Sequence, residues 1–324
     1  LTNCGAWRKG DGIMKARWVG VLMGVIAVMG IWGFEVQAAD KGEQGPVPPE
    51  QNWQIGFTPS YSSGKFGTDT TSTFLYAPLS IRRMFKDGDV TLVIPFVTAT
   101  SDGRTTLVGG NATRIDDGGG SNSGTGGGGG TADDGGCSGK DSNVSGKFRT
   151  CGTTSRLPGQ KVTTSGLGDI ILKGRYYVVE ERAYMPLIAI TGRMKMPTAS
   201  ASQGLGTGAF DYGAGVEVSK MLGDKWIAFL DGGYNVIGDV EGINFQNQHW
   251  YDVGAGYYFT KDVLVSAYYE EYRAIARGFV NARDVFIATN YTASAAWRFS
   301  GGVTVGLSDG APDFAVTVGT SYRF

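Results

Sequence analysis

Apolar and polar residues alternate along most of the chain from Gln51 onward. A period of two places successive side chains on opposite faces of an extended strand, so each alternating run predicts a strand with one apolar and one polar face. The runs have the length of about ten residues that a tilted strand needs to cross a bilayer. The pattern predicts strands at Trp53–Thr58, Ser72–Phe85, Val90–Thr100, Asp169–Val179, Ala183–Met196, Tyr212–Leu222, Trp226–Ile237, Trp250–Phe259, Val263–Arg273, Asp284–Phe299 and Val303–Leu307, and a last one in the tail that ends at Phe324.

Between these runs, short polar turns such as Lys86–Asp89 alternate with long polar loops. An outer-membrane barrel with both termini in the periplasm has its short turns at the inner rim and its long loops outside, whereas a soluble sandwich or lipocalin-like barrel has no reason to sort its loops by length. The pattern therefore predicts an all-β fold, a transmembrane up-and-down antiparallel β-barrel of about 12 strands. The external loops are predicted at residues 62–71, 101–168, 197–211, 238–249, 274–283 and 308–313.

The tail of the chain continues the alternation to its terminal phenylalanine. We expect Phe314, Val316, Val318, Tyr322 and Phe324 to face lipid, and Thr317, Ser321 and Arg323 to face inward. Such an ending resembles the C-terminal signal of outer-membrane barrels, with Gly319, Tyr322 and Phe324 as its residues. The prediction places the protein in the outer membrane of a Gram-negative bacterium, with membrane lipid and the barrel assembly machinery as partners. A soluble sheet can end in the same way, so the interpretation also depends on the N-terminal part.

The N-terminal part has the order of features of a secretory signal. Met14, Lys15 and Arg17 start a basic region, residues 19–34 are almost entirely apolar, and small residues precede Ala39. We expect residues 1–13 to be an upstream extension, 14–38 a cleaved signal peptide, 39–52 a periplasmic segment and 53–324 the barrel. The alternative is a single transmembrane anchor, for which about 16 apolar residues is short.

Composition supports this prediction and narrows the partners. The chain has 29 basic and 30 acidic residues, which gives no reason to expect nucleic acid as a partner. Its 53 glycines, with many tyrosines and phenylalanines, suit alternating strands with aromatic belts at the membrane interfaces. After Ala39 no stretch is apolar enough for a membrane helix, so a membrane protein must cross with strands.

The predicted loop 101–168 has an unusual composition, because glycine dominates it between Gly109 and Gly136. Such a sequence predicts a flexible external loop without a packed core. Cys137 and Cys151 both lie in this loop, and in an exported chain they predict a disulfide that closes it. Acidic pairs at its edges could hold calcium, although a solvated linker is favoured because their spacing matches no calcium-loop motif. These acidic residues are Asp116, Asp117, Asp133 and Asp134.

Alternation also predicts which charged side chains face the lumen, where charge is tolerated at membrane depth. The basic set comprises Lys173, Arg175, Arg193, Lys195 and Arg298, and the acidic set comprises Glu217, Asp231, Asp252 and Glu270. Two arrangements remain open. The charges either create a transverse field across a wet pore or form salt bridges across the lumen that plug it. A narrow or partly occluded lumen for a small-molecule solute is favoured, because a barrel of about 12 strands is narrow.

Candidate catalytic residues are few, so we do not expect an enzyme. The chain has one histidine, His249, and the nearest serine in the predicted strands, Ser266, has no supporting context. No metal or cofactor motif is present, and no cofactor is expected. An outer-membrane lipid hydrolase that uses His249 is the weakest hypothesis. A surface structural or adhesion protein, anchored by the barrel and presenting the long loop, is the main alternative to a channel.

Several glycine motifs carry a resemblance to a known family. The chain has Gly-Leu-Gly-Asp at 166–169, Lys-Met-Pro-Thr at 195–198, Gly-Leu-Gly-Thr-Gly at 204–208 and then Asp211. From Gly166 to Phe324 it resembles the outer-membrane transporter family named Putative MetA-pathway of phenol degradation. The resemblance implies an outer-membrane channel for uptake of aromatic or other hydrophobic compounds. The glycines at 204–208 permit a tight loop with positive φ, and Asp211 is expected to bind backbone amides there.

Overall fold

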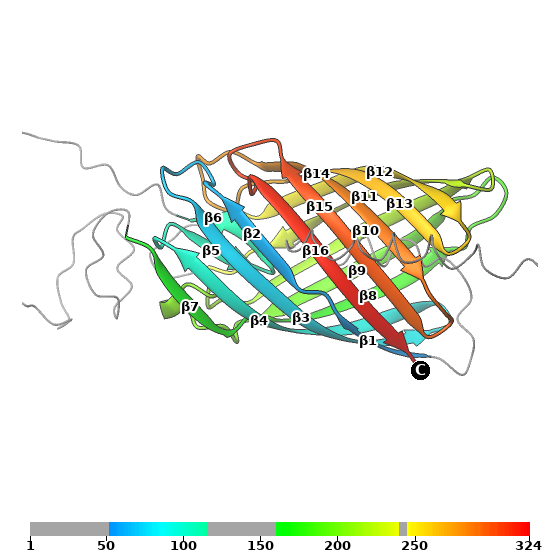
Figure 1. The fold of residues 1–324 in the computed structure, drawn as a ribbon, viewed down its shortest axis with the longest axis horizontal. Coiled ribbons are helices and arrows are strands. Elements are labelled where there is room, and N and C mark those ends of the chain that lie inside the picture. Colours follow the sequence, from blue (N-terminus) through cyan, green and yellow to red (C-terminus); the bar gives the residue numbers. More distant parts are fainter. Residues whose placement is uncertain (1–51, 116–159, 240–244) are drawn as a thin grey trace, which may run out of the picture. The chain divides into compact units, whose positions relative to one another are not determined.

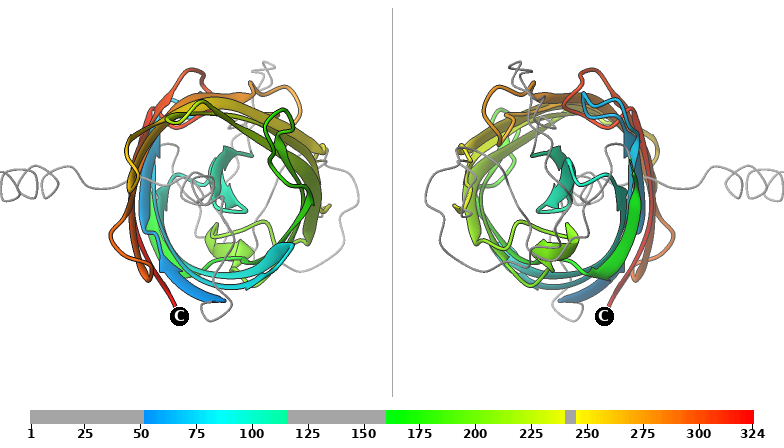
Figure 2. Two further views of the ribbon diagram at one scale, coloured as in Figure 1. Left: turned by 90° about the vertical axis from the view of Figure 1, so that its right-hand side faces the viewer. Right: turned by 90° about the vertical axis from the view of Figure 1, so that its left-hand side faces the viewer.

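The computed structural model describes residues 52–115, 160–239 and 245–324, and its main feature is a closed antiparallel barrel of 12 strands (Figures 1 and 2). The β-strands are β1 Trp53–Phe57, β2 Ser60–Gly64, β3 Ser72–Phe85, β4 Gly88–Ser101, β5 Thr105–Val108, β6 Asn111–Arg114, β7 Val162–Leu167, β8 Ile170–Val179, β9 Leu187–Met196, β10 Asp211–Leu222, β11 Trp226–Val236, β12 Gln248–Thr260, β13 Val263–Tyr272, β14 Ala282–Thr292, β15 Trp297–Gly306 and β16 Phe314–Arg323. A single 3-10 helix, η1, is described at Ala201–Gln203. Among the residues described, no helix is long and apolar enough to cross a membrane.

Two of the strands in the barrel wall are interrupted, and each of them is therefore named as two separate β-strands above. β1 and β2 both pair with β3 and β16, so they form one broken strand that closes the barrel. β7 and β8 likewise both pair with β4. The all-β barrel predicted from alternation is therefore confirmed. The signal peptide, the upstream extension, Cys137, Cys151 and the acidic pairs at 116–117 and 133–134 lie outside the described residues.

The tail forms β16, between β15 and the broken strand of β1 and β2. The rings of Tyr322 and Phe324 are exposed on its outer face and stack with their centroids 6.0 Å apart. Arg323, on the other face, is buried. The exposed Tyr322 and Phe324 and the buried Arg323 agree with the predicted orientation of the tail. Recognition by the assembly machinery stays a prediction.

Three predicted connections need correction. The loop predicted at 62–71 is shorter because β2 continues to Gly64. The loop predicted at 101–168 contains the hairpin of β5 and β6 as well as β7. The predicted strands Asp284–Phe299 and Val303–Leu307 imply a turn at 300–302, but the hairpin of β14 and β15 turns at residues 293–296. Ser294 makes this turn, since its hydroxyl accepts hydrogen bonds from the amides of Ala296 and Trp297. Gly302 stays in β15, where a side chain would collide with the Phe286 ring.

The outer face of the wall is apolar at positions that alternate with the buried ones. Leu230, near the middle of β11, is 57% exposed, and Leu222, beside a short turn at the end of β10, is 56% exposed. Exposure of large apolar side chains around a closed wall is the pattern of a surface solvated by lipid. Aromatic rings gather near the short-turn rim on β12 and β14–β16, where Trp297 contacts Tyr322 at 4.9 Å between centroids.

Replacing Leu230 by arginine is expected to cost about 2–4 kcal/mol of stability, because the charge would lie near the bilayer midplane. The matched change Leu222→Arg, at the membrane interface, is expected to cost about 0–1 kcal/mol. Reversible urea unfolding in liposomes, followed by tryptophan fluorescence, measures both. Equal costs would contradict the assignment of this face to lipid.

The β5–β6 hairpin lies inside the ring of strands rather than in the wall (Figure 2). It occupies the rim that carries the long connections, called here the long-loop rim. On one side Leu107 belongs to an apolar cluster with Phe74 of β3 and Val97 of β4. On the other side Val108 belongs to a cluster with Ile275 and other apolar residues of the long connections. The hairpin therefore spans this mouth of the barrel.

Polar contacts fix the root of the hairpin. Arg104 Nε donates to Asp102 Oδ2 at 2.7 Å, and Thr70 Oγ1 donates to the same oxygen at 2.6 Å. Burial acts to raise the pKa of Asp102, but hydrogen bonds from Arg104 and Thr70 hold this pKa below its ordinary value. The carboxylate therefore stays ionised at neutral pH, and the root of the hairpin is fixed to the neighbouring loop.

Candidate functional site: the barrel lumen

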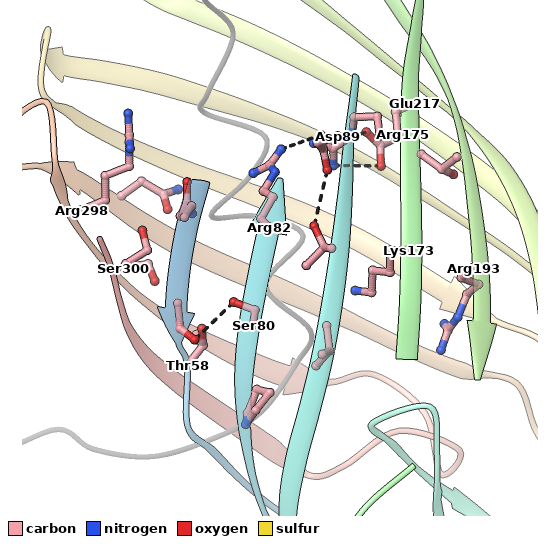
Figure 3. A pocket seen from close by; sticks show the side chains of 18 of the residues that line it. Thr58, Ser80, Arg82, Asp89, Lys173, Arg175, Arg193, Glu217, Arg298 and Ser300 are labelled. Carbon is pink, nitrogen blue, oxygen red and sulfur yellow. Dashed lines mark hydrogen bonds and ion pairs between the residues drawn. The ribbon is translucent and has the colours of Figure 1, made fainter. Parts of the chain in front are cut away.

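A cavity inside the barrel is lined by side chains from most strands of the wall. Figure 3 shows part of this lining, in which polar side chains of β3, β4, β8, β9, β10 and β15 point into the cavity. The labelled lining residues are Thr58, Ser80, Arg82, Asp89, Lys173, Arg175, Arg193, Glu217, Arg298 and Ser300. Five of the predicted lumen charges, Lys173, Arg175, Arg193, Glu217 and Arg298, thus line one cavity.

Two of the predicted charges, Arg175 and Glu217, form a chain of ion pairs along the wall with Arg82 and Asp89, which the sequence analysis did not single out (Figure 3). Asp89 Oδ2 lies 2.8 Å from Arg82 Nη2 and 3.6 Å from Arg175 Nη1, and Arg175 Nε lies 2.8 Å from Glu217 Oε2. Arg175 of β8 reaches Glu217 of β10 diagonally across β9, where their cross-strand partners are Thr191 and Ala189. These bonds connect strands that are adjacent or separated by one strand, and they follow the wall rather than cross the lumen, so these four residues do not plug it.

Removal of one carboxylate tests this chain of ion pairs. The change Asp89→Asn is expected to destabilise the barrel by about 1.5–3 kcal/mol, because the buried Arg82 loses a charge-assisted hydrogen bond and Arg175 loses an ion-pair partner. Urea unfolding in liposomes is the measurement. The change Asp87→Asn, in the adjacent exposed turn, is the control, and an equal effect would show that Asp89 has no special role.

The predicted acidic residues form a continuous row across five strands. Cross-strand partners are Glu217 with Asp231, Asp231 with Asp252, Asp252 with Glu270, and Glu270 with Asp284. Apart from Glu217, these carboxylates are buried, and they do not line the cavity. The sequence analysis missed Asp284 as a member of this inward-facing row, although its parity with Phe286 and Ala288 on β14 gave the signal.

Lys195 requires a correction. Its side chain has the predicted inward parity, but its ammonium is fully buried and does not face the open lumen. Nζ lies 2.8 Å from Asp211 Oδ2, 3.3 Å from Asp169 Oδ2 and 2.6 Å from Thr207 Oγ1. Every partner comes from the glycine motifs noted in the sequence. Those motifs therefore converge on one ionic cluster, called here the Lys195 cluster.

The Lys195 cluster also holds backbone amides of the long-loop rim. Asp169 Oδ1 accepts a hydrogen bond from the Ala199 amide at 3.0 Å, and Asp211 Oδ1 accepts one from the Gly238 amide at 2.9 Å. Asp211 was expected to bind amides of the 204–208 loop, so its partner is a different loop. Gly204 and Gly208 have φ of 73° and 75°, as the tight loop predicted there requires.

The histidine and serine considered for catalysis are not brought together. His249 is exposed on the outer face of β12, whereas Ser266 is buried on the inner face of β13. Among the described residues, no three Asp, Glu, His or Cys side chains converge to hold a metal ion. The inner wall also carries an apolar region, which the sequence analysis did not single out. Its members are Ile227, Phe229, Leu264, Tyr268, Phe286 and Ala288.

Comparisons with known proteins agree with this architecture. A family model described as Putative MetA-pathway of phenol degradation matches residues 90–324. The COG4313 outer membrane channel from Pseudomonas putida F1 is similar in structure, with a TM-score of 0.54 and 12% identity over 86% of this chain and 97% of that one. The KdgM porin (TM-score 0.44, 9% identity, 84% and 99%) and the Pseudomonas putida toluene transporter TodX (0.40, 9%, 91% and 99%) are more distant. No curated protein sequence matches the chain.

Proposed function

The chain belongs to the family described as Putative MetA-pathway of phenol degradation, and we propose that it is an outer-membrane channel for passive uptake of small aromatic or hydrophobic solutes. The observation that carries this proposal is the cavity within the closed wall, where the described ion pairs of Asp89 and Glu217 run along the wall. A wall built only to anchor a surface loop needs no such cavity. The match to a channel fold supports the same conclusion.

Two features support small solutes with apolar character. The β5–β6 hairpin narrows the long-loop rim, which excludes large solutes. The lining of the cavity includes apolar and aromatic side chains of β12 and β13, among them Trp250, Leu264 and Tyr272. An aromatic solute gains free energy by leaving water for such a surface.

Conductance of the purified protein in planar bilayers tests the channel, and uptake by wild-type and deletion strains tests the solute class. We expect discrete single-channel currents, and faster uptake of phenol and toluene than of sugars of similar size in the wild type only. A bilayer that stays sealed at every voltage would refute the channel.

The main alternative is a surface structural or adhesion protein anchored by the barrel. Residues 105–114 of the long loop fold into the mouth, where they contact β3 and β4, and this location favours a role in passage. Deleting residues 109–136 separates the two functions. Lost surface binding with unchanged solute uptake would support the anchor.

A further inference from the structure

A second cavity lies at the long-loop rim, separate from the lumen cavity described above. It has a volume of about 310 Å³ and is called here the outer cavity. Its lining comes from strand β6 of the hairpin and from the connections that contain Phe66, Phe279 and Pro312. An apolar cavity of about 150 Å³ is enough to hold benzene. The outer cavity therefore has room for a solute with a single aromatic ring.

The lining of the outer cavity includes a group of apolar side chains. These are Phe66, Ala112, Ala274, Phe279, Val280 and Pro312. Arg114 of β6 lies over the Phe279 ring, with its Cζ 4.5 Å from the ring centroid, and its Nη1 donates to the Gly67 carbonyl oxygen at 2.6 Å. Arg273 Nη2 donates to Gln246 Oε1 at 2.8 Å. Both guanidinium groups are therefore held against protein atoms, and the cation–π contact holds the Phe279 ring at the wall of the cavity.

The β5–β6 hairpin separates the outer cavity from the lumen cavity. Residues 111–114 of β6 line the outer cavity, whereas the turn that precedes them reaches side chains of the lumen cavity. In that turn a Cβ on Gly110 would lie 3.1 Å from the Tyr76 ring, and the Gly109 carbonyl oxygen lies 3.5 Å from Arg193 Nη2. Tyr76 and Arg193 both line the lumen cavity. The hairpin inside the ring of strands (Figure 2) therefore has one cavity on each side.

The two cavities adjoin at Tyr272, the last residue of β13. Among the described residues, Tyr272 alone lines both of them. Its ring stacks against Trp250 of β12, which lines the lumen cavity, with centroids 6.2 Å apart and planes 20° apart. A Cβ on Gly215 or Gly233 would approach the Trp250 ring to 3.0 or 2.8 Å, so the indole lies closely over β10 and β11. The two rings thus form a continuous aromatic surface from the outer cavity to the lumen cavity.

We propose that the outer cavity is the entry site of the channel, where a single-ring aromatic solute binds before it passes to the lumen along Tyr272 and Trp250. The inference rests on the proposed function and adds to it a binding site and a selecting residue. An aromatic solute on this path exchanges water for contacts with other rings, which lowers its free energy. A sugar on the same path loses hydrogen bonds to water that ring faces do not replace. Tyr272 therefore selects for aromatic solutes.

Initial uptake rates of radiolabelled toluene and arabinose, in a deletion strain that carries the wild-type or a variant protein, test the proposal. We expect toluene uptake through the wild type to saturate. Phe279→Ala is expected to raise the half-saturating toluene concentration by about tenfold, because one ring contact and its apolar surface are lost at the entry site. Tyr184→Ala, which removes a ring that is 97% exposed beside a short turn, is the control and is expected to behave as wild type.

A change at Tyr272 tests selection. Tyr272→Ala is expected to lower the ratio of toluene uptake to arabinose uptake about tenfold, and Tyr272→Phe, which keeps the ring, is expected to restore it. If Tyr272→Ala fails to reach the outer membrane, Phe279→Ala, in a surface connection, still decides the proposal. Toluene uptake that does not saturate, an unchanged half-saturating concentration in Phe279→Ala or an unchanged ratio in Tyr272→Ala would overturn the inference while leaving a channel. Equal toluene uptake with and without the wild-type protein would instead overturn the proposed function.

Discussion

Replacement of Lys195 by methionine is expected to cost the barrel about 3–5 kcal/mol of stability. Methionine keeps the length and apolar stem of lysine but removes the ammonium that lies between Asp169 and Asp211. Both carboxylates are buried, so the variant would leave two negative charges close together without their compensating cation. Uncompensated buried charge is the costliest outcome of breaking an ion pair. The effect should therefore exceed that of any exposed lysine in the chain.

Lys220→Met is the matched control. Lys220 Nζ lies 3.0 Å from Glu181 Oε1, but both side chains are more than 20% exposed, and such pairs contribute about 0–1 kcal/mol. Urea unfolding in liposomes compares the two variants. Adding Asp169→Asn and Asp211→Asn to Lys195→Met is expected to recover part of the lost stability, because the two uncompensated negative charges are removed. If Lys195→Met is no worse than Lys220→Met, the Lys195 cluster does not stabilise the barrel.

Removal of residues 105–114 is expected to raise the single-channel conductance several-fold. These residues form the hairpin that spans the long-loop rim, from the cluster around Phe74 and Val97 to the cluster around Ile275. Pore conductance grows with the open cross-section, and the hairpin lies inside the ring of strands at this mouth (Figure 2). Recording in planar bilayers at fixed salt measures the change.

A point substitution separates the effect of the hairpin's position from that of its length. Leu107 is 3% exposed within its apolar cluster, so Leu107→Asp is expected to undock the hairpin and to raise the conductance as well. Thr113→Asp, at a half-buried polar position of the same hairpin, is the control and is expected to change it little. If neither the deletion nor Leu107→Asp alters the current, the narrowest section lies deeper, at the level of Lys173 and Arg193.

Sequence reasoning located strands better than turns. The run at Ser72–Phe85 coincides with β3 because its alternation and its flanking turn are both strong local signals. The turn predicted at 300–302 was wrong because glycine has two uses in such a barrel. At Gly302 it makes room for the Phe286 ring of the neighbouring strand, a contact that no local pattern reveals. The real turn depends on the hydroxyl of Ser294.

In the candidate site, too, local pattern predicted some features correctly, whereas others depended on contacts between distant segments. Parity along each strand was enough to direct Lys173, Arg175, Arg193 and Glu217 inward. It could not distinguish Lys195, which has the same parity, because its burial depends on Asp169, Thr207 and Asp211 arriving from other segments. Composition likewise predicted one flexible loop at 101–168, and the apolar residues at its start, such as Leu107, were overlooked among the glycines.

The sequence by itself determined the strands, their inner and outer faces and the class of barrel, because a period of two is a local property that each residue shares with its neighbours. Only the tertiary structure decided which charges meet. The register between strands aligns Lys173 with Arg193 and forms the row from Glu217 to Asp284. It also sets the position of the hairpin. Register arises from pairing between residues far apart in the chain, and a shift of one position would reverse every face.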